Sequence, residues 1–185
     1  MKNNCNFIRF SMVFLLMLFF AGTSDNSYTH TFSGTFFPGE IGNLKIGNFR
    51  EYDDIGKNIS MGYGSKYTEL THYVYPAYTA RGNKMSFETS YNSYMDAIYT
   101  TYKGAELLED SVFITKDLNG RHSKFSFTTN FHSEQQEVFS YLFLFEDKGW
   151  FIKLRVTFPK INAEASELEI QEYIEHLPLP VKEYE

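Results

Sequence analysis

The clearest alternation of hydrophobic and polar positions lies in residues 138–158. Two apolar arms flank the tetrapeptide Glu-Asp-Lys-Gly, which predicts a β-hairpin with a tight turn. In the second arm the residues at positions 150, 152, 154, 156 and 158 are all hydrophobic, and alternation with period two places them on one face of a strand. The first arm is apolar on both faces, as is typical of a strand in the middle of a sheet. We predict that this hairpin is the centre of the fold.

Shorter segments alternate in the same way and predict further strands at residues 31–37, 58–64, 67–75, 112–115 and 123–131. Between residues 86 and 103 the hydrophobic positions instead recur every three or four residues, which predicts an amphipathic helix with Ser86 as its N-cap. A second helix is predicted from Asn162 to about residue 177, with Leu168 on its buried side. Residues 182–185 are predicted to form a loose tail.

This order of strands, helix, strands and helix predicts the fold class. Each helix has an apolar stripe that must be buried, so we predict an α+β domain in which two helices cover an antiparallel β-sheet. A chain of 185 residues with 43% hydrophobic residues is long enough for one domain with its own core. The 19 phenylalanines and 14 tyrosines also favour a sheet. We assign residues 25–185 to this single domain.

Residues 1–24 have the layout of a secretory signal peptide. Lys2 and Arg9 precede an apolar run at residues 10–21, and small residues follow it. The run is shorter than the roughly 20 apolar residues of a membrane span, so we predict a cleaved signal rather than a retained anchor. The only cysteine, Cys5, lies in this segment, so the remaining domain has no disulfide. We therefore predict a bacterial envelope protein, periplasmic or secreted.

Charge excludes some partners. Cleavage would remove two basic residues and no acidic one, which changes the formal net charge from −6 to −8. Such a chain repels phosphate backbones and anionic lipid heads. We predict no nucleic-acid partner and no stable membrane insertion after cleavage.

The sequence contains no specific catalytic or metal-binding motif. Gly-Tyr-Gly-Ser65 resembles half of a nucleophile elbow but lacks the second glycine after the serine. The five histidines are not spaced as zinc ligands. Three acidic pairs, at residues 53–54, 109–110 and 146–147, are predicted at turns or a helix end, where solvated charges are common. We predict no catalytic, cofactor or metal site, and consider an enzyme less favoured than a binding protein.

Two groups of residues form a candidate binding surface. Lys153 and Arg155 share the mixed face of the second hairpin arm, which we expect to meet water. There they could bind an anion or pair with acidic residues of the last helix. Those acidic residues are Glu164, Glu167 and Glu172. Tyrosines concentrate in the hairpin predicted at residues 58–75 and could form an exposed aromatic patch for sugars or peptides. For Lys153 and Arg155 the favoured interpretation is a salt-bridged or solvent-facing edge of the sheet, and for the tyrosines it is packing within the sheet. The candidate surface comprises Tyr63, Tyr67, Tyr73, Tyr75, Lys153 and Arg155.

Several motifs carry a resemblance to known proteins. Three segments resemble an uncharacterised family of exported bacterial proteins. They are Phe-Pro at 37–38 before a glycine-broken stretch, Tyr-Thr-Glu-Leu-Thr-His-Tyr-Val-Tyr-Pro at 67–76, and Gly-Trp-Phe-Ile-Lys-Leu-Arg-Val-Thr-Phe-Pro at 149–159. The element order is also similar to that of PsbP-like domains, α-β-α sandwiches that include extrinsic proteins of photosystem II. The first resemblance implies export without an assigned activity. The second implies an accessory or interaction role, since a fold does not fix a function.

Together these observations favour an exported, non-enzymatic binding or accessory module of the cell envelope, with a protein or glycan partner. Two alternatives stay open. One is an envelope hydrolase in which only the fold brings an acid and a histidine together, and a pocket with convergent polar side chains would favour it. The other is a carrier of a small apolar ligand, which would show an apolar cavity between sheet and helix.

Overall fold

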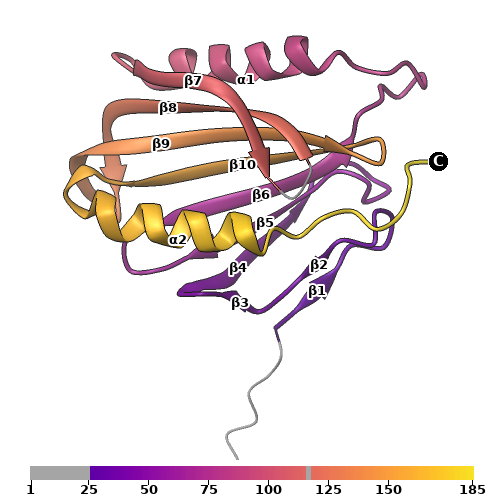
Figure 1. Cartoon of the computed structure of the whole chain (residues 1–185), viewed down its shortest axis with the longest axis horizontal. Helices are drawn as coiled ribbons and strands as arrows, with labels where there is room; N and C mark the ends of the chain where they lie inside the picture. The colour runs from indigo at the N-terminus through magenta and orange to yellow at the C-terminus, as the bar shows by residue number, and fades with distance from the viewer. Residues whose placement is uncertain (1–25, 116–117) are drawn as a thin grey trace, which may run out of the picture.

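The computed structural model describes residues 26–115 and 118–185, so the predicted signal peptide lies outside the described residues. An antiparallel sheet forms the middle of the molecule (Figure 1). From one edge to the other, its eight strands are β3 (Glu40–Ile41), β4 (Leu44–Glu51), β5 (Ile59–Gly64), β6 (Glu69–Pro76), β10 (Trp150–Pro159), β9 (Glu134–Asp147), β8 (Leu118–Phe131) and β7 (Glu106–Thr115). Strands β1 (Tyr28–Thr29) and β2 (Phe36–Phe37) form a separate small sheet. The predicted α+β class, with two helices on an antiparallel sheet, is confirmed.

The predicted hairpin is confirmed as the middle of the sheet. It consists of β9 and β10, joined by Lys148 and Gly149, which both have a positive φ as a tight hairpin turn requires. Strand β10 lies between β9 and β6, so its backbone is hydrogen-bonded on both sides. Its residues Trp150, Ile152 and Leu154 are fully buried on one face. These three side chains belong to the core beneath the second helix.

The two helices pack against opposite faces of the sheet. Ser86 is the N-cap of helix α1 (Phe87–Thr101) as predicted, since its hydroxyl accepts a hydrogen bond from the amide of Thr89. Helix α2 (Ala163–Glu175) follows a single 3-10 turn, η1 (Lys160–Asn162). The prediction was wrong about two details of α2. Asn162 makes no capping hydrogen bond through its side chain, and Leu168 is 63% exposed because it points away from the sheet.

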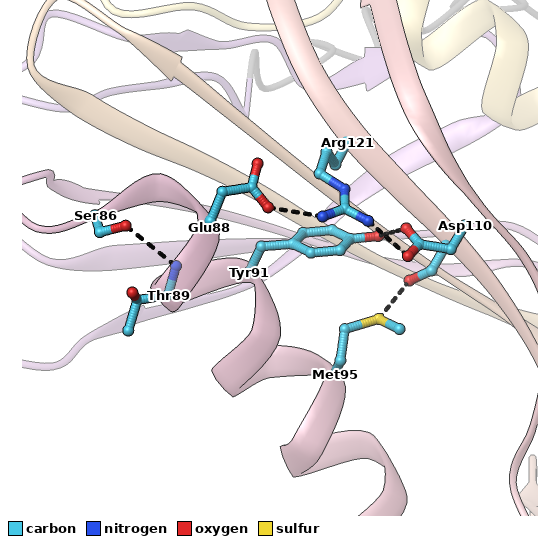
Figure 2. Close-up of polar contacts among 8 residues, drawn as sticks. Ser86, Glu88, Thr89, Tyr91, Met95, Asp110 and Arg121 are labelled. Atoms are coloured by element: carbon cyan, nitrogen blue, oxygen red, sulfur yellow. Dashed lines mark hydrogen bonds and ion pairs between the residues drawn. The ribbon is translucent and has the colours of Figure 1, made fainter.

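Polar contacts fasten α1 to the edge strand β7 and to its neighbour β8 (Figure 2). The guanidinium of Arg121 bridges the carboxylates of Glu88 on α1 and Asp110 on β7, at 2.7 and 2.6 Å. The hydroxyl of Tyr91 donates to Asp110 at 2.9 Å, and the Arg121 guanidinium lies 4.4 Å from the Tyr91 ring centre. Asp110 was predicted to be a solvated charge at a helix end. It lies inside a ten-residue strand, which extends well beyond the predicted strand at 112–115.

The C-terminal tail is also ordered against the body of the protein, so the prediction of a loose tail was wrong. The indole of Trp150 donates to the carbonyl of Lys182 at 3.1 Å, and the Lys182 ammonium donates to the carbonyl of Thr31. The ring of Tyr184 stacks on Tyr78 at a centroid distance of 5.2 Å. Short-range hydrophobic periodicity gives no signal for such contacts, because residues far apart in sequence make them.

One glycine is required by close packing rather than by its backbone angles. Gly120 of β8 lies between Phe113 of β7 and Phe145 of β9, and a Cβ atom there would overlap the Leu144 carbonyl oxygen and the Phe145 ring. We expect Gly120→Ala to lower the free energy of unfolding by about 3 kcal/mol, as overpacking does in a rigid core. Denaturant unfolding measures this loss, and Gly47→Ala is the control because a Cβ there meets only ordinary contacts. Equal stability of the two variants would contradict the prediction.

Candidate functional site

Helix α1 covers only half of its face of the sheet. It packs on β8 and β9 through buried residues such as Phe125 and Leu142. The other half of this face is formed by β4, β5 and β6, and neither helix of the described residues covers it. It presents the exposed Arg50 and the partly exposed Gly62 and Thr71. A cavity of about 450 Å³ lies over these three strands. We call this region the open half-face.

Lys153 lies at the boundary between α1 and the open half-face. It lines a cavity of about 240 Å³ together with four tyrosines and Asn58. Its ammonium is 4.0 Å from the ring centre of Tyr73 and 4.1 Å from that of Tyr94 on α1, distances at which cation–π attraction operates. Burial, and to a lesser extent the neighbouring Arg155, lower the pKa of Lys153 to about 8.

Arg155 lies on the same face of β10, two residues further along. Its guanidinium donates to the hydroxyl of Ser140 at 3.0 Å, but its Nε is buried without a hydrogen-bond partner among the described residues. Burial lowers the pKa of Arg155, and the nearby Tyr102 and Tyr73 act in the opposite direction. A buried guanidinium normally has a carboxylate or several acceptors around it. Arg155 is therefore a cation with unused hydrogen-bonding capacity.

No carboxylate in the described part of the chain forms an ion pair with either of these two cations. Among residues 26–115 and 118–185, no ion pair involves Lys153 or Arg155. The predicted pairing with acidic residues of the last helix is wrong, because α2 covers the opposite face of the sheet, where Glu167 instead pairs with Lys124. The carboxylate of Glu69 lines the open half-face, and it pairs with His132. The expectation that this face of β10 meets water along its length is also wrong, since Phe151 is fully buried beneath α1.

The structure divides the predicted tyrosine group between three places. Tyr73 and Tyr75 lie on the α1 side of β6, next to Lys153, and the hydroxyl of Tyr75 donates to that of Tyr94 at 2.5 Å. Tyr63 points to the opposite face, where its hydroxyl donates to the carbonyl of Pro38 and its ring packs on Tyr173. Tyr67 lies between β5 and β6, beside Lys66. The six candidate residues therefore do not form one continuous surface.

Sequence reasoning missed three members of the site. Tyr94 was assigned to the buried stripe of the first helix, and Arg50 and Tyr52 were treated as part of a connecting segment. In the structure the ring centres of Tyr52 and Tyr73 are 6.1 Å apart. The hydroxyl of Tyr52 forms a hydrogen bond of 3.1 Å with the hydroxyl of Ser60, and the Arg50 guanidinium lies 6.0 Å from the centre of the Tyr52 ring. We call the resulting group the cationic tyrosine surface. It comprises Arg50, Tyr52, Tyr73, Tyr94, Lys153 and Arg155.

An acid and a histidine do come together on the other face of the sheet. The Nε2 atom of His122 lies 2.9 Å from Glu109 and 3.2 Å from the hydroxyl of Ser111. A nucleophile triad needs the hydroxyl and the carboxylate at different ring nitrogens, so that the histidine can relay a proton between them. Because both groups approach the same nitrogen here, this cluster does not have triad geometry. Within the described part of the chain, no group of three or more His, Cys, Asp or Glu residues is placed to hold a metal ion.

Comparisons with known proteins give the fold. No protein-family model matches the chain, and no curated protein sequence matches it. The chain is similar to the solution structure of cyanobacterial PsbP (CyanoP) from Synechocystis sp. PCC 6803, with a TM-score of 0.52 and 9% identity over 84% of this chain and 92% of that one. A crystal structure of PA94, a protein of unknown function from Pseudomonas aeruginosa, aligns with a TM-score of 0.49 and 10% identity over 85% of this chain and 99% of that one.

The predicted PsbP-like layout is therefore confirmed. At 9% identity the similarity to CyanoP extends to the fold, and the residues of the site must be interpreted from their own chemistry. Neither helix in the described residues is long and apolar enough to cross a membrane.

Proposed function

We propose that this protein is an exported, non-enzymatic binding module whose cationic tyrosine surface receives an oxyanion of its ligand. The observation that carries the proposal is the pair Lys153 and Arg155, two largely buried cations without a carboxylate partner among the described residues. Burial of a positive charge costs free energy unless an opposite charge or several acceptors compensate it. A phosphate, sulfate or carboxylate group of a ligand would supply that compensation.

The surroundings of the two cations suit such a ligand. The hydroxyls of Tyr52 and Ser60 and the guanidinium of Arg50 line the adjoining cavity and can donate hydrogen bonds to anionic oxygens. The rings of Tyr52, Tyr73 and Tyr94 line the cavity beside Lys153, where a sugar or other ring can pack against them. A ligand with an anionic group and a ring, such as an acidic glycan, combines both features. This deepens the expectation of a glycan or protein partner in the envelope.

The proposal of export rests on the layout of residues 1–24. The cationic tyrosine surface is a local exception in an acidic protein. A long polyanion such as nucleic acid would meet the surrounding negative charge, whereas a compact anionic group would not. The proposed ligand is therefore a small or locally anionic one.

The test is a titration of the protein recovered from the envelope fraction of its cells, with intact mass spectrometry to show whether the first two dozen residues have been removed. Inorganic pyrophosphate, sulfate and citrate are added in turn while amide chemical shifts are followed. We expect saturable shifts confined to β4, β5, β6, β10 and the adjoining side of α1. Absence of saturable shifts would show that Lys153 serves only to hold α1 on the sheet through its tyrosine contacts, and a full-length mass in the membrane fraction would contradict export.

A further inference from the structure

A second cavity lies on the opposite face of the sheet, between α2 and strands β7, β8 and β9. Its volume is about 330 Å³, within the range of small-ligand pockets. Phe113 of β7 and Phe143 of β9 form an aromatic floor, with their ring centres 5.3 Å apart. Ile170 and Ile174 of α2 form the facing wall. We call this cavity the α2 groove, and its apolar lining favours a ligand with an apolar body.

The polar side of the α2 groove is formed by His122 and Glu109. Because a carboxylate only accepts hydrogen bonds, the 2.9 Å contact places a proton on the Nε2 atom of His122. The other ring nitrogen, Nδ1, is buried and has no hydrogen-bond partner among the described residues. Burial lowers the pKa of His122, and the nearby Glu109 and Asp110 oppose this shift. The ring is therefore neutral at neutral pH and leaves the charge of Glu109 uncompensated.

The remaining charges of the groove are also acidic. Glu167 is compensated, since it accepts from the Lys124 ammonium at 2.8 Å and from the Tyr141 hydroxyl at 3.1 Å. Glu175 accepts a hydrogen bond from the neutral side chain of Gln171. No lysine or arginine is among the described residues that line the groove. The groove thus combines an apolar lining with negative charge from Glu109 and Glu175.

We propose that the α2 groove binds a small molecule with an ammonium group and an apolar part about the size of a phenyl ring. The body would lie between the aromatic floor and the wall formed by Ile170 and Ile174, and the ammonium would lie against Glu109. A carboxylate in the same position would be repelled, so the sign of the ligand's charge is the central claim. This site is independent of the cationic tyrosine surface, because the two lie on opposite faces of the sheet.

The proposal is tested with two probes of similar size and opposite charge, phenethylamine and 3-phenylpropionate, in titrations of the whole protein followed by NMR. We expect phenethylamine to shift signals of Phe113, Ile170 and Ile174 in a saturable manner, and 3-phenylpropionate to bind at least about tenfold more weakly. Equal affinities, shifts elsewhere in the protein, or no saturable binding of phenethylamine would each overturn the proposal. None of these results bears on pyrophosphate binding at the other face.

Variants locate the charge that selects the amine. We expect Glu109→Gln to weaken phenethylamine binding about tenfold, the effect of one lost charge-assisted contact. Glu106→Gln is the matched control, since Glu106 is an exposed carboxylate on the same strand and does not line the groove. Because Glu109 also contacts His122, Glu175→Gln provides a second test at an exposed helix position and should cause a smaller loss. Unchanged affinity in both variants would overturn the proposal.

Discussion

Acidification from pH 7 to pH 4 is expected to lower the free energy of unfolding by about 3 kcal/mol through His72 alone. This side chain is fully buried in the core beneath α2, where its Nδ1 atom lies 2.9 Å from the hydroxyl of Tyr173 and its Nε2 atom has no partner among the described residues. Burial lowers the pKa of His72 to about 3. The charged form is therefore strongly disfavoured in the folded protein.

The sign of the effect follows from the two pKa values. In the unfolded chain His72 has the ordinary value of 6.5, so between pH 6.5 and about 3 the unfolded state binds a proton that the folded state does not. Stability from this group is fully present above pH 6.5 and is lost as the pH falls towards 3. Burial also lowers the pKa of His30, which adds a contribution in the same direction.

A variant separates His72 from the other titrating groups. His72→Gln keeps a hydrogen-bonding side chain near Tyr173 but cannot take up a proton, so its unfolding free energy should depend less steeply on pH between 6.5 and 4. Denaturant unfolding at several pH values measures the difference in slope between variant and wild type. His132→Gln serves as the control, since His132 is exposed. Parallel pH profiles for wild type and His72→Gln would show that the buried ring does not cause the acid sensitivity.

Removal of either buried cation is expected to reduce the affinity for inorganic pyrophosphate by about 10- to 100-fold, the range for one charge-assisted contact in a partly buried site. The variants are Lys153→Met and Arg155→Met, which keep most of the apolar volume of each side chain. Calorimetric titration at pH 7 measures the loss. Lys84→Met is the matched control. The Lys84 ammonium lies 2.7 Å from the carboxylate of Glu146, and Lys84 is not part of the cationic tyrosine surface. Affinities equal to that of Lys84→Met would contradict the assignment of the site.

Two further properties distinguish an anion site from a packing contact. Anion affinity of the wild type should fall as the pH rises through about 8, the pKa of Lys153, because the neutral amine no longer attracts the ligand. Lys153→Arg should keep the affinity and lose this pH dependence. Without ligand, Lys153→Met should be at least as stable as wild type at pH 7, since it removes a desolvated charge. A clear loss of stability would instead show that the contacts with Tyr73 and Tyr94 are the main role of Lys153.

The fold class and the centre of the sheet could be predicted from the sequence alone. Alternation over residues 138–158 identified β9 and β10, because strand side chains repeat with period two over many residues and the signal accumulates. The three- and four-residue spacing after Ser86 identified α1 for the same reason. These patterns are local, because burial of one face of a strand or helix determines which positions of that same element are hydrophobic. Leu168 shows the limit, since a single hydrophobic residue on a helix does not reveal which side is buried.

Which residues come into contact at the site depends on how the helices and strands pack, and local patterns do not predict this packing. The sequence put Lys153 and Arg155 on one face of a strand, but not which helix covers that face; α1 covers it and α2, with its glutamates, covers the other. Tyr52 and Tyr94 lie next to Lys153 only because strand pairing and helix packing bring together residues that are far apart in the sequence. Tyr63 is not part of the site, because the β5–β6 pairing places it opposite Leu70 and therefore on the other face of the sheet from Tyr73. Hydrophobic periodicity fixes the face of each element, whereas the assembly of elements fixes the chemistry of the site.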